Sequence, residues 1–315
     1  MPASPLVVLF FSGWSQMLVY GFNAVLFVIG MYLLGKRKAR EGILFQVMSS
    51  VILFALATVS AVVGTVMVVA GYASITAPIA VNLKACSIIQ YVVLHLIDFA
   101  AFSVLIFRCF NIWSRDWKVI AVPVVAILTE TGVYYAGLRE YIKIQFATGL
   151  QQQASGDVLQ KSLGLTTAAL VLAAFSNALL TLLIAGRIWW LKRRLKRVLS
   201  GGRGLGGIAG NLPQKYDSVI AITMESGIII PIFQIIYLVY MVRNATSADH
   251  DALTIMAFML PQVIAFAPLL IMVRVGLGVT VETDRDVITS VDIIDHHRPV
   301  ELELDSVSGR KGLTL

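Results

Sequence analysis

Seven long apolar stretches divide this chain of 315 residues, and they restrict its fold more than any other feature does. A helix needs about 20 mostly apolar residues to cross the hydrocarbon core of a bilayer. The seven stretches lie at about 9–34, 43–72, 83–110, 119–138, 163–191, 219–242 and 252–276. The longer ones predict tilted helices, or helices that extend beyond the lipid. The sequence therefore predicts an all-α integral membrane protein, a seven-transmembrane helix bundle.

The composition agrees with a membrane protein. The chain is 58% hydrophobic and only 14% charged, whereas a soluble domain carries about 25% charged residues. The net charge of +7 comes from basic clusters beside the apolar stretches. Such clusters face anionic lipid head groups and set topology. We therefore expect the lipid bilayer as a partner, and no nucleic acid.

The distribution of Lys and Arg predicts the orientation. The first, third and fifth connectors, with the adjoining helix ends, carry fifteen of these residues, and the other side carries five. Because basic residues are retained in the cytoplasm, we expect the N-terminus outside and the C-terminus cytoplasmic, in the plasma membrane. Residues 1–278 would form the seven-helix domain. Residues 279–315 would form an acidic cytoplasmic tail whose polar composition predicts disorder.

The fifth connector, 187–217, holds eight basic residues and is the most prominent predicted cytoplasmic surface. Its centre, GGRGLGGIAGN, is too rich in glycine to continue a helix. The basic residues predicted to face lipid or an intracellular partner are Lys192, Arg193, Arg194, Lys196 and Arg197.

Two short motifs outside the predicted spans are weaker indications of a modification or a metal site. Asn244-Ala245-Thr246 is a glycosylation sequon in a predicted outer loop, so close to the membrane that a chance match is the simpler explanation. Asp295-His296-His297 could attract a metal ion in the tail, although a flexible, solvated surface cluster is the better explanation. We predict neither a metal ion nor a cofactor.

Three ionisable residues lie at mid-depth in the third and fourth predicted spans. His95 and Asp98 are three residues apart, and so share a helical face, while Glu130 lies at a similar depth on the next span. Charges at this depth usually face a bundle interior or a watery cavity. His95, Asp98 and Glu130 are therefore a candidate pocket. The alternative is that they only join helices through hydrogen bonds.

A second group of charges lies near the predicted cytoplasmic face. Arg108 ends the third span, Arg274 ends the seventh, and Glu225 lies in the first turns of the sixth. An ion pair among them would form a latch that releases the sixth helix when it breaks. The alternative is that both arginines extend to the membrane interface without a partner.

Prolines and amides complete the predicted interior. Pro231 lies in the sixth span, and Pro261 and Pro268 lie in the seventh, where each removes a backbone hydrogen bond and favours a kink. Four buried amides are expected to join helices through hydrogen bonds: Asn23, Asn177, Gln234 and Gln262.

Seven helices with an outer N-terminus and a basic fifth connector resemble the architecture of G-protein-coupled receptors. The chain departs from the rhodopsin-like motifs at two places. The third span ends in Arg108-Cys109-Phe110 where those receptors have an acidic residue, Arg and Tyr. The seventh span has Ala267-Pro268-Leu269-Leu270 where they have Asn-Pro-x-x-Tyr.

A closer resemblance covers residues 216–278. It includes Tyr216-Asp217-Ser218-Val219-Ile220-Ala221, Glu225-Ser226, Pro261-Gln262-Val263-Ile264-Ala265-Phe266-Ala267-Pro268 and Arg274-Val275-Gly276. These segments are similar to a family of uncharacterised mushroom-type (basidiomycete) seven-transmembrane proteins. The resemblance implies the seven-helix topology and singles out Glu225, Pro268 and Arg274, without implying a ligand.

Two functions follow from these patterns. The first is an orphan receptor-like membrane protein that relays a signal from an unknown external or intramembrane ligand to cytoplasmic partners, with a G protein as a candidate. The alternative is a transporter or channel that uses His95, Asp98 and Glu130. We do not predict an enzyme, because His95 is the one histidine within a predicted span and a three-histidine metal site needs three. A retinal pump is not expected either, since the seventh span has no lysine.

Overall fold

The computed structural model describes residues 5–35, 43–74, 81–113, 116–146, 155–200, 227–243 and 250–276. These residues form seven helices and contain no strand. The helices are α1 (Pro5–Gly35), α2 (Ile43–Ala73), α3 (Leu83–Ile112), α4 (Trp117–Phe146), α5 (Ser155–Ser200), the helix Gly227–Arg243 and α7 (His250–Gly276). The predicted all-α fold is confirmed for this part of the chain.

Six of the helices are long and apolar enough to cross a membrane. The helix Gly227–Arg243 is apolar but shorter. The predicted sixth span began at 219, and residues 219–226 lie outside the described ranges, so the seventh crossing stays a prediction. The protein is a multi-pass membrane protein with at least these six candidate spans. The orientation in the membrane also remains a prediction. The sequon at Asn244, the tail 279–315 and the His296-His297 pair lie outside the described residues, so the predictions about them stay predictions.

Two helices are longer than their apolar stretches. The prediction ended the fourth segment at 138, whereas α4 continues to Phe146; α5 begins before residue 163 and ends after residue 191. Hydropathy marks where lipid contact ends, not where the backbone stops being helical. Glu140 and Lys143 pair one turn apart at 2.8 Å in the last turns of α4, and such pairs stabilise an exposed helix end.

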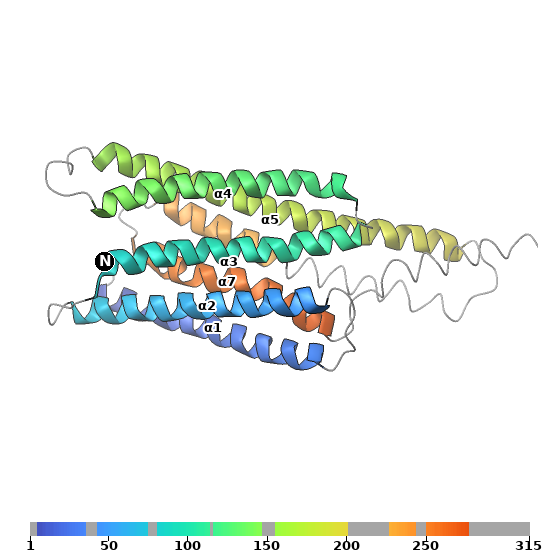
Figure 1. Ribbon diagram of the computed structural model, residues 1–315, viewed down its shortest axis with the longest axis horizontal. Coiled ribbons are helices and arrows are strands. Elements are labelled where there is room, and N and C mark those ends of the chain that lie inside the picture. The colour runs from blue at the N-terminus through green and yellow to red at the C-terminus, as the bar shows by residue number, and fades with distance from the viewer. Residues whose placement is uncertain are drawn as a thin grey trace, which may run out of the picture.

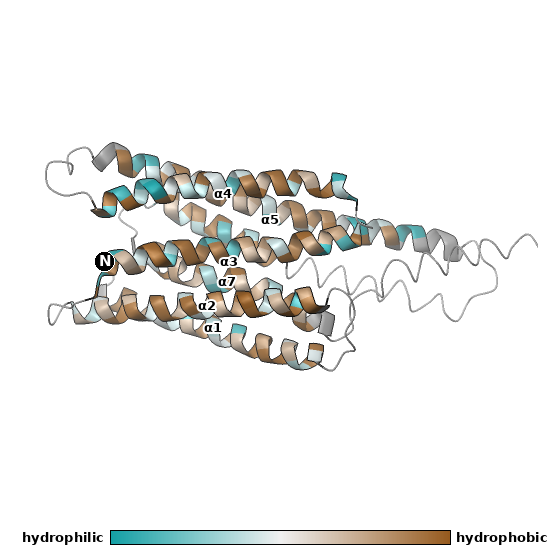
Figure 2. Cartoon of the chain, in the orientation of Figure 1, coloured by the Kyte–Doolittle hydropathy of each residue, from teal (hydrophilic) through white to brown (hydrophobic). Residues whose placement is uncertain are grey.

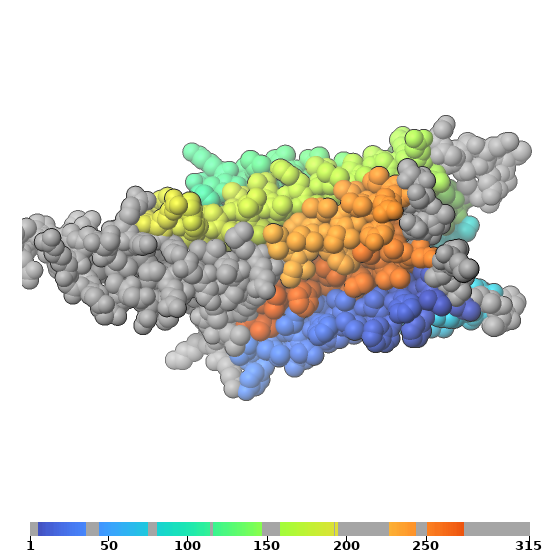
Figure 3. All heavy atoms as spheres, turned by 180° about the vertical axis from the view of Figure 1, so that it is seen from behind, coloured from blue at the N-terminus to red at the C-terminus, as the bar shows by residue number. Residues whose placement is uncertain are grey.

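Figure 1 shows the helices lying side by side along the long axis of the molecule. α3 is central and contacts α2, α4, α5 and α7, while α1 packs mainly on α7 and α4 mainly on α5. From behind, the helix Gly227–Arg243, in orange, lies beside α5 (Figure 3). α5 extends past the other helices at one end. We call this the basic end, defined by Trp113, Arg187, Arg193 and Arg194.

Hydrophobic residues, in brown, occupy much of the length of the helices (Figure 2). Large apolar side chains point outward on several helices, with Trp14 60% exposed and Leu128 62% exposed. Teal, hydrophilic positions gather at the helix ends and on the extension of α5. Exposed apolar area of this extent marks contact with lipid, so the outer surface is a lipid-facing one.

Buried amides join the helices, as predicted. Asn23 Nδ2 on α1 donates to Gln262 Oε1 on α7 at 3.2 Å and to the Gln262 carbonyl at 2.9 Å. Gln262 Nε2 in turn donates to the Ala57 carbonyl of α2 at 2.9 Å. Asn177 of α5 donates to Gln234 Oε1 at 3.1 Å. The predicted cross-linking role of these four amides is confirmed.

The prolines predicted to favour kinks all lie inside helices. Pro261 and Pro268 interrupt the hydrogen bonding of α7, and Pro231 lies in the second turn of Gly227–Arg243. A proline at position i cannot donate to the carbonyl at i−4. For Pro231 that carbonyl belongs to Gly227, and Thr181 Oγ1 of α5 donates to it at 3.4 Å. A neighbouring helix thus supplies the donor that the proline lacks.

Candidate functional site

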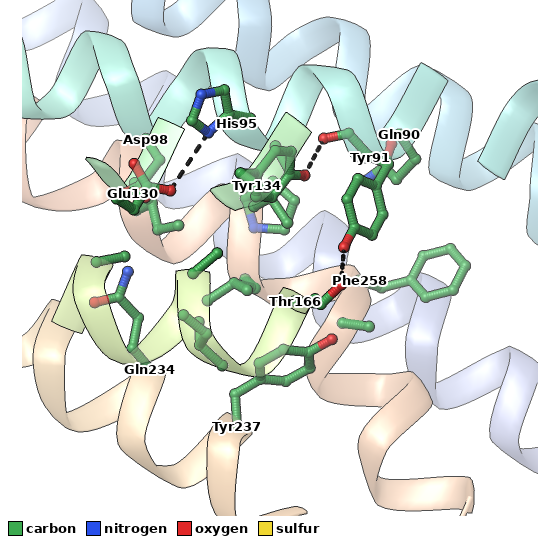
Figure 4. A pocket seen from close by; sticks show the side chains of 18 of the residues that line it. Gln90, Tyr91, His95, Asp98, Glu130, Tyr134, Thr166, Gln234, Tyr237 and Phe258 are labelled. Carbon is green, nitrogen blue, oxygen red and sulfur yellow. Dashed lines mark hydrogen bonds and ion pairs between the residues drawn. The ribbon is translucent and has the colours of Figure 1, made fainter. Parts of the chain in front are cut away.

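A cavity of about 190 Å³ lies inside the bundle. Residues of α2, α3, α4, α5, the helix Gly227–Arg243 and α7 line it (Figure 4). Its α3 residues run from Ser87, in the second turn of that helix, to Asp98. It therefore occupies the half of the bundle away from the basic end, toward the opposite end, which is defined by Lys84, Glu140 and Lys143.

The three predicted pocket residues all line this cavity. His95 and Asp98 come from α3, and Glu130 comes from α4. Their side chains are almost fully buried, with 3%, 6% and 2% of the residue exposed. His95 Nδ1 lies 3.6 Å from Glu130 Oε1, and Figure 4 shows the three grouped in one part of the cavity. The structure thus brings together residues that are up to 35 positions apart.

Aromatic side chains form a second part of the lining. The His95 ring stacks on Tyr134, with centroids 4.3 Å apart, and Tyr134 contacts Tyr91 at 4.9 Å. Tyr237 and Phe258 come from the helix Gly227–Arg243 and from α7. The sequence analysis did not identify these residues. A signal was present, because Tyr91, His95 and Asp98 follow each other at spacings of four and three, and Glu130 and Tyr134 at a spacing of four.

Hydrogen bonds hold the aromatic residues in place. The Tyr134 hydroxyl donates to the Tyr91 carbonyl, and the Tyr91 and Thr166 hydroxyls lie 2.6 Å apart. Gln90 Nε2 donates to Ser60 Oγ of α2 at 2.8 Å. These bonds connect α2, α3, α4 and α5 around the cavity, so its walls are defined by buried polar contacts.

Three buried atoms of cavity residues have no hydrogen-bond partner within the described structure. They are Gln90 Oε1, His95 Nδ1 and Asp98 Oδ1. A buried polar group without a partner is costly, and native structures contain few of them. All three side chains belong to the cavity lining, so the cavity contains buried polar atoms whose hydrogen bonding is incomplete within the described residues.

The predicted latch residues are described only in part. Arg108 Nη2 donates to the Ile271 carbonyl of α7 at 3.3 Å, so Arg108 joins α3 to α7 near the basic end. Glu225 lies outside the described residues, and so does the side chain of Arg274. An ion pair among the three stays a prediction, whereas the α3–α7 contact that it requires is present.

Arginine and tryptophan side chains stack at the basic end. The Arg187 guanidinium lies 5.2 Å from the Trp113 ring and 4.6 Å from the Trp190 ring. Arg193 lies 3.7 Å from Trp189, and both Arg193 and Arg194 are exposed. The side chains of Lys192, Lys196 and Arg197 are outside the described set. The described residues form a cationic and aromatic collar of the type found at membrane interfaces.

The described residues contain no group of three or more His, Cys, Asp or Glu placed to hold a metal ion. Comparisons with protein-family models, with curated proteins and with solved structures found no match. The fold and the cavity define the class of the protein as a multi-pass helical membrane protein with an acidic internal cavity.

Proposed function

We propose that this protein is a receptor-like seven-helix membrane protein that binds a small ligand in the cavity and relays the event to cytoplasmic partners, with a G protein as a candidate. The observation that carries the proposal is the cavity around Asp98, whose lining includes buried polar atoms that have no hydrogen-bond partner among the described residues. The proposal places the N-terminus outside the plasma membrane, so the cavity lies in the outer half of the bundle.

Two helices connect the cavity to the basic end. α3 carries Asp98 in the cavity and Arg108 about 15 Å further along the same helix. α7 carries Pro261 and Ile264 in the cavity and Ile271, the acceptor of the Arg108 hydrogen bond. A ligand that shifts α7 against α3 would therefore change the contact between Arg108 and Ile271. Rigid helices with two arrangements are the usual means of such coupling.

The packing beyond the cavity favours a receptor over a transporter or channel. A buried apolar cluster of residues from α3, α4, α5 and α7 lies between the cavity and the basic end; it includes Phe102, Leu105, Cys109, Ile127, Leu180, Ile184 and Ile271. Phe102 is 1% exposed and lies one turn beyond Asp98. A conducting path would need polar or hydrated lining through this layer. A ligand that is separated from the basic end by this apolar cluster suits signalling better than transport.

The test is made on the full-length protein in proteoliposomes. A small-molecule library is first screened for ligands that raise the unfolding temperature of the wild type but not of Asp98→Asn. A receptor is expected to bind such a ligand with an affinity that changes on addition of guanine nucleotide to membranes containing G proteins. It should not accumulate the ligand inside sealed vesicles. Accumulation that depends on Asp98 would favour the transporter and contradict the receptor.

A further inference from the structure

We infer that the cavity binds a small organic cation, an ammonium group carrying one apolar group of about the size of an aromatic ring, with the Asp98 carboxylate as its counter-ion. The inference rests on the ligand site of the proposed function and adds the chemical class of the ligand. Four features of the cavity carry it: its acceptors, its charge, its aromatic rings and its volume.

The first feature is a surplus of oxygen acceptors. Asp98 Oδ1 and Gln90 Oε1 are buried, line the cavity and have no partner among the described residues. A ligand with several N–H donors matches this set.

The second feature is an excess of acidic side chains. Among the described residues, the lining includes Asp98 and Glu130 and no lysine or arginine. His95 is the one basic side chain among them, and it already lies 3.6 Å from Glu130. Within this part of the chain, Asp98 therefore has no countercharge in a bundle surrounded by lipid. Buried charges are usually paired, and a cationic ligand would pair this one, whereas an anionic ligand would meet two carboxyl groups.

The third feature is the set of aromatic rings beside the acceptors. Tyr91, Tyr134 and Tyr237 line the cavity from three different helices. Tyr134 is stacked on His95, whereas Tyr237 makes no ring contact within the described part of the chain. Ring faces attract cations, and the attraction is strongest when the cation is removed from water. The same rings provide an apolar surface for the rest of the ligand.

The fourth feature is size. The cavity of about 190 Å³ is slightly larger than an engineered protein cavity of about 150 Å³ that binds benzene. One ring with a short aminomethyl arm therefore fits within it. Benzylammonium is a suitable probe, because benzyl alcohol and benzoate have nearly the same shape with a neutral and a negative head.

The experiment measures binding of the three probes to full-length protein in nanodiscs by isothermal titration calorimetry. We expect benzylammonium to bind at least about tenfold more tightly than benzyl alcohol, and benzoate more weakly than either, because a hydrogen bond to a charged group is worth about a factor of ten or more. Asp98→Asn should remove most of the preference for benzylammonium. Glu140→Gln is the control, since this carboxylate pairs with Lys143 outside the cavity.

A second variant tests the inference independently, in case Asp98→Asn does not fold. Tyr237→Leu keeps every carboxylate and should weaken benzylammonium more than benzyl alcohol. The inference is overturned if benzoate binds as well as benzylammonium, if Asp98→Asn folds and binds with unchanged preference, or if benzylammonium does not bind at millimolar concentration. Binding that requires Asp98 but produces no response to guanine nucleotide supports the ligand class and contradicts the receptor. A neutral ligand whose binding does respond to guanine nucleotide would support the receptor and contradict the ligand class.

Discussion

Gln262 joins three helices through one residue. Its Nε2 donates to Ala57 of α2, while its side-chain and backbone oxygens accept from Asn23 of α1. Its side chain is fully buried, at 0% exposure. Replacement by an apolar residue would remove the donor to the Ala57 carbonyl and the side-chain acceptor of Asn23, whereas Asn23 would keep the backbone carbonyl of residue 262 as an acceptor.

We expect Gln262→Leu to lower the free energy of unfolding by about 1 kcal/mol, because it removes two interhelical hydrogen bonds and each contributes about 0.6 kcal/mol on average in a membrane protein. The measurement is thermal unfolding of the purified protein in detergent. Gln46→Leu is the control, because the Gln46 side chain is partly exposed on α2 and makes none of the interhelical bonds described above. Equal effects of the two changes would contradict the structural role of Gln262.

Gly64 permits the close approach of α1 and α2. A Cβ added at Gly64 would collide with the amide of Gln16, which is buried and donates to the Ser60 carbonyl at 3.0 Å. Gly132 of α4 is a matched position where a Cβ would meet nothing within 4 Å.

Gly64→Ala is therefore expected to lower the unfolding temperature, because it displaces Gln16 from its hydrogen bond. Gly132→Ala should leave it unchanged or raise it, since alanine is favoured over glycine in a helix by about 1 kcal/mol. Both variants are compared with the wild type by differential scanning fluorimetry. A gain in stability for Gly64→Ala would show that α1 and α2 are less closely packed than described.

At the scale of the element, the pair formed by Pro231 and Thr181 links α5 to the helix Gly227–Arg243. Thr181→Val removes the donor to the Gly227 carbonyl without changing the side-chain shape. We expect a loss of about 1 kcal/mol. In a Pro231→Ala background the loss should be much smaller, because the new backbone N–H bonds to that carbonyl.

A double-mutant cycle on unfolding free energies measures this coupling. The four proteins are the wild type, the two single variants and the double variant. An additive result, with the same loss in both backgrounds, would mean that Thr181 does not replace the missing proline donor.

The element scale also explains which parts of the fold the sequence predicts. Six apolar stretches predicted six long helices, because lipid contact requires apolar side chains over a fixed length. α4 and α5 continue past the ends of the predicted spans, to Phe146 and Ser200, through charged residues such as Arg139, Glu140, Arg193 and Arg194. Polarity excludes lipid contact and says nothing against a helix in water.

The sequence likewise predicts only part of the candidate site. Asp98, His95 and Glu130 were found because a charge within an apolar stretch is conspicuous. Tyr91 and Tyr134 were missed, since a tyrosine in a span is equally consistent with lipid, interface or interior positions. Only the rotation of each helix about its axis decides among these, and that rotation depends on packing between segments distant in sequence.

At the scale of the whole molecule, the orientation can be tested with single cysteines. In a Cys86→Ala background, Arg193→Cys places a thiol at the basic end and Lys143→Cys places one at the opposite end; the native Cys109 is buried. A membrane-impermeant maleimide added to intact cells is expected to label Lys143→Cys and to leave Arg193→Cys unlabelled, since basic clusters are retained in the cytoplasm.

Permeabilised cells provide the control, because both thiols should then react. The reverse pattern in intact cells would place the basic end outside. The proposal of cytoplasmic partners at that end would then be wrong, while the ligand class of the cavity would be unaffected.

The length of α5 has a mechanical consequence. Its 46 residues span about 69 Å, more than twice the hydrocarbon thickness of a bilayer. Ala173 borders the cavity, and Ser200 lies about 40 Å further along the rod. A tilt of about 5° around Ala173 would move the far tip by about 3.5 Å. If α5 pivots as a rigid rod, a sub-ångström adjustment beside the cavity would become a displacement of several ångströms at its far tip, which is the size of movement that the proposed signalling function requires.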